Sequence, residues 1–107
     1  MDRFEISLLR NYYGALLTQR QNEMLVMHYD EDLSFGEIAS ICGVSRQAVL
    51  DGINKGEKHL VEFEEKLHWV EKDQRINSLL DDLTLAIGKD ETKQAACVAE
   101  IKRILVE

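Results

Sequence analysis

The stretch SFGEIASICGVSRQAVLDGI, residues 34–53, decides the fold. A helix-turn-helix crosses two helices at close range around a short turn. The crossing needs a small side chain in the first helix and a residue that tolerates positive φ at the turn. It also needs apolar residues just after the turn and four residues apart in the second helix. The residues at these positions are Ala39, Gly43, Val44, Val49 and Ile53. The spacing therefore predicts a helix-turn-helix.

Polar residues mark where the N-terminal helices begin. Thr18 followed by Gln21, and Ser34 followed by Glu37, have the form of a capping box. Ser45 is placed to cap the second helix of the motif. With the apolar spacing, these signals predict helices over residues 4–16, 19–29 and 35–42 and a fourth beginning after the cap. The residues expected to face inward in the third helix are Ile38, Ala39 and Ile41.

The fourth helix is expected to be long. Apolar residues and one glycine recur in steps of four and three, as in a coiled-coil seam. They are Val49, Ile53, Gly56, Leu60, Phe63, Leu67 and Val70. We expect this seam to be covered by a second copy in a homodimer or by residues 73–107 of the same chain.

The C-terminal part is expected to form a helical extension that serves packing or dimerisation. The predicted domains are a helix-turn-helix domain over residues 1–72, with a turn near residues 73–74, and an extension over residues 73–107. Gly88 is expected to end the fifth helix and Asp90 to cap the sixth. The residues expected to face inward in the sixth are Ala95, Val98, Ile101, Ile104 and Leu105.

Composition predicts an all-α, cytoplasmic protein. Proline is absent, and the sequence has 6 glycines and a charged fraction of 31%. The apolar runs are far shorter than the ~20 residues that a membrane span needs, and the start has no apolar signal region. Cys42 and Cys97 are isolated in the sequence, which predicts two buried thiols in a reducing compartment.

Motifs for catalysis, cofactors or metals do not occur in the sequence. There is no phosphate-binding loop, nucleophile elbow or paired-carboxylate site. His28, His59 and His68 lack metal-ligand spacing, and the acidic residues 30–32 lack the remainder of a calcium loop. We expect no enzyme activity, no cofactor and no metal, and we expect residues 30–32 to form a solvated loop.

The beginning of the second motif helix is the expected reading surface. In a helix-turn-helix, this end faces base edges in the major groove. Arg46 is suited to guanine and Gln47 to adenine, each by a bidentate hydrogen bond. The residues expected to contact DNA are Ser45, Arg46, Gln47, Leu50 and Asp51 on the first turns, with Lys55 and Lys58 on backbone phosphates.

The net charge opposes this interpretation. It is −7, whereas affinity for nucleic acid comes mainly from neutralised phosphates. An acidic protein is steered towards basic partners. The alternative is therefore an adaptor that binds protein or RNA without sequence-specific DNA binding.

The same residues carry a family resemblance. Residues 18–60 resemble region 4 of sigma factors, and the chain is similar to the YlxM family of small bacterial helix-turn-helix proteins. The carrying segments are NYYGALLT (11–18), YDEDLSFGEIA (29–39), VSRQAV (44–49), EKHL (57–60) and FEEKLH (63–68). The resemblance implies a sigma-like DNA-binding fold. It also implies a regulatory link to the signal recognition particle pathway, with the particle's protein or RNA as partner, because family genes lie beside the gene of its GTPase.

Two glycines depart from the family pattern inside the reading helix. Gly52 and Gly56 each cost about 1 kcal/mol of helix stability relative to alanine. Gly56 lies on the seam, where we expect it to mark a close approach between helices. Gly52 has no such explanation from the sequence, and we expect it to loosen the reading helix.

Overall fold

The computed structural model describes residues 2–107 and shows six α-helices and no strand among them. The α-helices are α1 (Arg3–Tyr13), α2 (Gln19–Leu25), α3 (Phe35–Cys42), α4 (Arg46–Leu67), α5 (Trp69–Ala86) and α6 (Glu91–Leu105). A 3₁₀ turn (Gly14–Leu16) follows α1 and a π-helical turn (Val26–Asp30) follows α2. The all-α prediction is confirmed.

The predicted caps are present at the beginning of the helices. The Thr18 hydroxyl accepts from the Gln21 N–H at 3.1 Å, and the Gln21 side chain accepts from the Thr18 N–H at 3.3 Å. Ser34 and Glu37 form the same reciprocal pair before α3, at 3.1 and 3.2 Å. These bonds satisfy N–H groups that have no partner within the helix, and so they fix where α2 and α3 begin.

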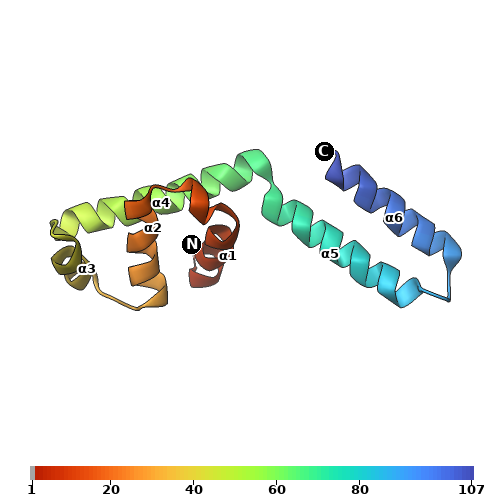
Figure 1. Ribbon diagram of the computed structural model, residues 1–107, viewed down its shortest axis with the longest axis horizontal. Coiled ribbons are helices and arrows are strands. Elements are labelled where there is room, and N and C mark those ends of the chain that lie inside the picture. Colours follow the sequence, from red (N-terminus) through yellow and green to blue (C-terminus); the bar gives the residue numbers. More distant parts are fainter. Residues whose placement is uncertain (1) are drawn as a thin grey trace. The chain divides into compact units, whose positions relative to one another are not determined.

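The first compact unit ends at Leu67 and is built on α4. Figure 1 shows α3, α2 and α1 following one another along one side of this helix. The most deeply buried side chains come from all four helices and include Ile6, Tyr13, Leu25, Ile38, Val49, Ile53 and Leu60. Each large apolar side chain buried in this way contributes roughly 1.5–3 kcal/mol.

The helices of this unit cover most of the predicted seam. Val49 and Leu60 are 0% exposed and Ile53 is 2% exposed, with α1, α2 and α3 packed on α4. Neither expected cover, a second copy or residues 73–107, is needed for this part of the seam. The expectation was wrong because α1 and α2 also cover the seam, and not only the short third helix.

The long helix also ends earlier than predicted. His68 has φ 55°, a left-handed conformation that breaks the helix after Leu67. Val70 therefore lies in α5 and not on the α4 seam, and the chain divides into its two units between Leu67 and His68 and not after residue 72. No glycine or proline in the sequence signals this break.

The second unit is a hairpin of α5 and α6. Figure 1 shows the two helices side by side. Gly88 adopts a φ of 76° in the connection, and the Asp90 carboxylate accepts from the Lys93 N–H at 3.0 Å, as the predicted cap. The buried residues of the hairpin are Val70, Ala86, Cys97 and Ile104.

Several residues expected to face inward do not. In α6, Ile104 is buried and Ile101 is half-buried, but Ala95, Val98 and Leu105 are exposed. A single neighbouring helix covers only one strip of an amphipathic helix. In α3, Ile41 is 62% exposed, because α4 covers only the face that carries Ile38. Cys97 is buried as expected, whereas Cys42 is partly exposed.

Candidate nucleic-acid interface

The crossing of α3 and α4 has the geometry of a helix-turn-helix. Gly43 adopts a left-handed φ of 68°, and its N–H donates to the Ala39 carbonyl. The Val44 N–H donates to the same carbonyl at 3.1 Å. Val49 and Ile53 are buried on α4, while Ala39 and Val44 are half-buried at the crossing. The five residues predicted from spacing therefore lie on both sides of the turn at Gly43, with Val49 and Ile53 on the buried face of α4.

Glycines on α4 allow α2 to approach it closely. A Cβ on Gly52 would lie 2.7 Å from the Met24 sulfur, and one on Gly56 would lie 3.1 Å from a Leu25 methyl carbon. Both glycines are thus explained by the same helix contact. The expectation that Gly52 merely loosens the reading helix is wrong, because Met24 occupies the space that a side chain would take.

The first turn of α4 presents two of the predicted reading residues to solvent. Ser45 caps the helix by accepting from the Ala48 N–H at 3.0 Å. Arg46 and Gln47 follow and are exposed. Within residues 2–107 the Arg46 guanidinium has no ion-pair partner. The Gln47 amide donates to the Asp51 carboxylate at 3.0 Å, so a carboxylate lies within the reading face.

The remaining reading residues extend along the same helix. Leu50 is half-buried and Lys55 is exposed. The Lys58 ammonium lies 3.9 Å from the Glu62 carboxylate, an exposed pair that contributes little. Asn54, exposed and seven positions after Gln47, lies on the same face. Asn54 was not among the residues predicted from the sequence, although helical spacing alone would have indicated it.

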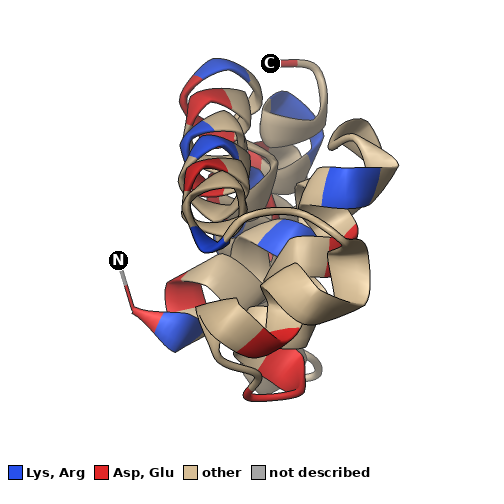
Figure 2. Ribbon diagram, turned by 90° about the vertical axis from the view of Figure 1, so that its left-hand side faces the viewer, with Lys and Arg blue, Asp and Glu red and all other residues tan. Residues whose placement is uncertain are grey.

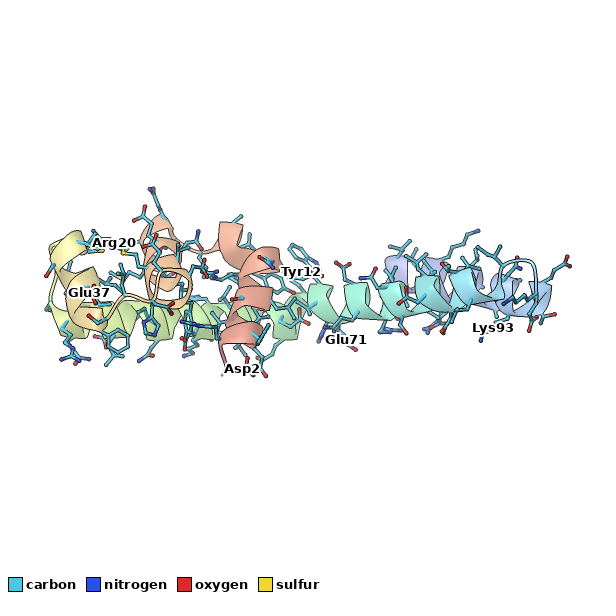
Figure 3. The ribbon with its side chains drawn as sticks, turned by 90° about the horizontal axis from the view of Figure 1, so that it is seen from below. Asp2, Tyr12, Arg20, Glu37, Glu71 and Lys93 are labelled. Atoms are coloured by element: carbon cyan, nitrogen blue, oxygen red, sulfur yellow. The ribbon has the colours of Figure 1, made fainter. Side chains whose placement is uncertain are left out.

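Two further charged residues lie near the motif, and Figure 3 labels both, Arg20 on α2 and Glu37 on α3. The Arg20 guanidinium donates to the Cys42 carbonyl at 3.4 Å, at the C-terminal end of α3, where a cation is favoured by the helix dipole. The Glu37 carboxylate is held at the other end of α3 by the capping box. Both charges are therefore engaged within the fold.

The acidic loop before α3 is tied to α1. Asp30 accepts from Arg10 at 2.8 Å and Asp32 accepts from Arg3. The prediction of a merely solvated loop is therefore incomplete. Residues 30–32 alone do not indicate these ion pairs, because the partner arginines lie in another helix.

Two tyrosines attach other helices to α4. The Tyr29 hydroxyl donates to Glu57, and the Tyr13 hydroxyl donates to Glu64. Burial, together with the hydrogen bond to Glu57 and the charge of that carboxylate, raises the pKa of Tyr29 to about 12. These bonds hold the scaffold behind the reading turn.

A second surface lies between α1 and the last turns of α4. It is a groove of about 240 Å³ whose floor is apolar. The residues lining it are Leu8, Leu9 and Val61, with Glu5, Glu64 and Glu65 on its rim.

Charges are mixed over the ribbon. Figure 2 shows Lys and Arg segments separated from one another by acidic or uncharged ones. On the predicted reading surface, the positive residues Arg46, Lys55 and Lys58 accompany the negative Asp51. The surface therefore offers few positive charges to phosphates.

The described residues hold neither a cluster of metal-ligand side chains nor a helix that could cross a membrane. Among residues 2–107, no three His, Cys, Asp or Glu side chains are grouped so that they could hold a metal ion. None of the helices in this range has the length and apolar character for a membrane crossing.

The fold and the exposed first turn of α4 define the chain as a helix-turn-helix protein. Comparison with known proteins shows which family of helix-turn-helix proteins it belongs to. A family model described as "Putative helix-turn-helix protein, YlxM / p13 like" matches residues 1–101. The chain belongs to this family, UPF0122.

Individual relatives agree with this assignment. A UPF0122 protein of Desulforamulus reducens is 41% identical over 102 residues, covering 94% of this chain and 87% of the relative. A UPF0122 protein of Symbiobacterium thermophilum is 44% identical over 90 residues, 84% of each chain. One from Shouchella clausii is 42% identical over 99 residues, covering 92% of this chain and 90% of its own length.

Proposed function

We propose that this protein is a cytoplasmic DNA-binding regulator that reads duplex DNA with the first turns of α4. The observation that carries the proposal is the exposed pair Arg46 and Gln47 at the beginning of a helix whose other face is locked into a core. A reading helix needs a rigid support, since looseness costs affinity through lost side-chain and loop entropy.

The charges of the site define how it would bind. Arg46 supplies a bidentate donor suited to guanine. Gln47 must release Asp51 before its amide pairs with adenine, and Asp51 itself repels phosphates. With Arg46 on a base and only Lys55 and Lys58 to neutralise phosphates, the logarithm of affinity would fall with the logarithm of salt with a slope of about −2. We therefore expect weak non-specific binding and a stronger dependence on sequence.

The proposal also concerns the process that the protein regulates. The family resemblance implies a role in the signal recognition particle pathway. A regulator acting as a homodimer would present two reading helices, and these would require half-sites ~34 Å apart. Most of the α4 seam is buried within its own unit, so such a dimer must use another surface.

Selection from a random duplex pool, followed by salt-titrated fluorescence anisotropy, tests the proposal. We expect salt-dependent binding that Arg46→Ala weakens about tenfold or more, the effect of losing a contact worth ~1–3 kcal/mol. Lys66→Ala is the matched control, because Lys66 is exposed on the last turn of α4. Equal binding by wild type and Arg46→Ala, or no binding at low salt, would contradict the proposal.

The groove between α1 and α4 favours a second candidate function. Its apolar floor and three rim carboxylates fit an amphipathic helix that carries Lys or Arg beside its apolar anchors. The protein would then be an adaptor for a basic protein partner. Leu8 is 37% exposed on the groove. A designed basic amphipathic peptide should bind wild type, and Leu8→Arg should abolish binding. Peptide binding without any DNA binding would select the adaptor.

A further inference from the structure

The α5–α6 hairpin leaves apolar residues partly or largely exposed at coiled-coil spacing. On α5 they are Ile76, Leu80 and Leu83, with Ile87 at its C-cap, and on α6 they are Val98, Ile101 and Leu105. Of these, Ile76, Leu83 and Ile101 are half-buried. Leu80 is 43%, Ile87 62% and Leu105 69% exposed. Steps of four and three produce one straight stripe along a helix, the pattern that packs against another helix.

A hollow on this face is open to a partner. Leu83 of α5 and Ala95, Val98 and Ala99 of α6 line a shallow surface of about 490 Å³. The alanines permit close approach of another helix, whereas Leu83 and Val98 supply apolar contacts. Glu91 and Lys102 lie on its rim.

The hairpin alone has a small core. Its buried side chains are one valine, one alanine, one cysteine and one isoleucine, namely Val70, Ala86, Cys97 and Ile104. Units of about 40 residues usually require a disulfide, a metal or oligomerisation to be stable. Both cysteines are free thiols. Additional burial is therefore expected at the exposed face.

The arrangement of charges on the face is self-complementary. Glu91 and Lys102 lie eleven positions apart, or about 16 Å along α6, on the same side of the helix as the hollow. Neither has an ion-pair partner within residues 2–107. When two copies of α6 run antiparallel with the midpoint between Ala96 and Cys97 of one copy opposite that of the other, Glu91 of each copy lies opposite Lys102 of the other. The same alignment places Ala95 opposite Val98, a small residue against a larger one.

We propose that this face binds a second copy of the same chain, with the two α6 helices antiparallel and the two hairpins forming a four-helix bundle. Such bundles pack hairpins with apolar stripes inward at crossing angles near 20°. This inference supplies the surface for the homodimer of the proposed function, but it rests on the hairpin and not on DNA binding.

Sedimentation equilibrium of the full chain without DNA tests this inference separately from the proposed function. We expect wild type to be a dimer. Val98→Glu should produce a monomer, with a dissociation constant raised at least about a hundredfold by a charge in the apolar face. Circular dichroism should show that the helices of the first unit remain, whereas the separated hairpin loses helix.

Charge variants make the test specific to the antiparallel register. Glu91→Lys and Lys102→Glu should each weaken the dimer about tenfold, because each replaces two opposite-charge pairs by two like-charge pairs. The double variant Glu91→Lys/Lys102→Glu should restore wild-type affinity. Lys93→Glu is the matched control, with the same charge change on α6 outside the hollow.

Three results would overturn the inference. These are a monomeric wild type at high micromolar concentration, a dimer unaffected by Val98→Glu, and a double variant no better than the single ones. Each can occur whether or not the protein binds DNA, so failure here leaves the proposed function standing.

Discussion

The two units differ in how completely they bury their apolar faces. In the first, three helices cover one side of α4, and residues such as Ile53 and Leu60 are nearly or fully inaccessible. In the second, two helices cover only each other, and Val98 and Leu105 remain 39% and 69% exposed. The apolar faces of similar amphipathic helices are therefore buried to different extents in the two units. The extent depends on how many helices pack against each one. The first unit supports a reading surface, and the second offers a surface for association.

The largest difference in stability between the two units is expected when an aspartate replaces an apolar residue in each. Ile53→Asp places a charge in a closed core and should destabilise the first unit by about 4 kcal/mol or more, enough to unfold it. Val98→Asp places the same charge at the exposed face of the second unit and should leave the first unit folded. Urea denaturation followed by circular dichroism measures both. An equal loss of stability in the two variants would contradict the difference in burial between the two units.

Separating the units should also give unequal results. The fragment 1–67 should fold and unfold cooperatively, whereas the fragment 68–107 should be largely unfolded when dilute and gain helix with concentration. Circular dichroism across a concentration series checks this. A dilute, fully helical hairpin fragment would show that the second unit is complete by itself.

Glycine substitutions probe the tight contact inside the first unit. Gly56→Ala presses on Leu25, which is fully buried, and should cost roughly 1–3 kcal/mol by overpacking. Gly52→Ala presses on the Met24 thioether, whose flexible side chain can move. It should change stability by less than about 1 kcal/mol, because the better helix propensity of alanine offsets the rearrangement. Thermal denaturation of the two variants measures both losses of stability. A larger loss for Gly52→Ala than for Gly56→Ala would contradict this packing.

An effect close in size to that of Gly52→Ala, but dependent on pH, is expected at the Tyr29–Glu57 hydrogen bond. Tyr29→Phe should cost about 1 kcal/mol near neutral pH. The pKa of Tyr29 is raised from 10.0 to about 12. The stability gained from this shift is therefore complete below pH 10 and lost as the pH rises towards 12. The free-energy difference between wild type and Tyr29→Phe should shrink over that interval in denaturation curves. A constant difference would show that the hydroxyl does not titrate as described.

The sequence signals that succeeded are local. Thr18, Ser34 and Asp90 cap helices through bonds to residues three positions away, and Gly43 needs only its own φ. These determinants lie within a few residues of one another, so that spacing alone reveals them. The helix-turn-helix was predictable for this reason.

The failures concern contacts between distant segments. The left-handed His68 ends α4 without any glycine or proline, and the fit of Met24 against Gly52 depends on how α2 crosses α4. The exposure of Val98 follows from the number of helices around α6, which periodicity does not reveal. The bond from Gln47 to Asp51 is an exception, because the two residues lie only four positions apart and residue identity alone left open whether they would pair.

The most direct test of the account is a nitrogen–proton correlation spectrum of the full chain titrated with random-sequence duplex DNA at low salt. We predict that the amide signals of residues 45–58 shift and that added salt reverses the shifts. Shifts confined to the groove around Leu8 and Val61, or no shifts at all, would contradict DNA reading by α4.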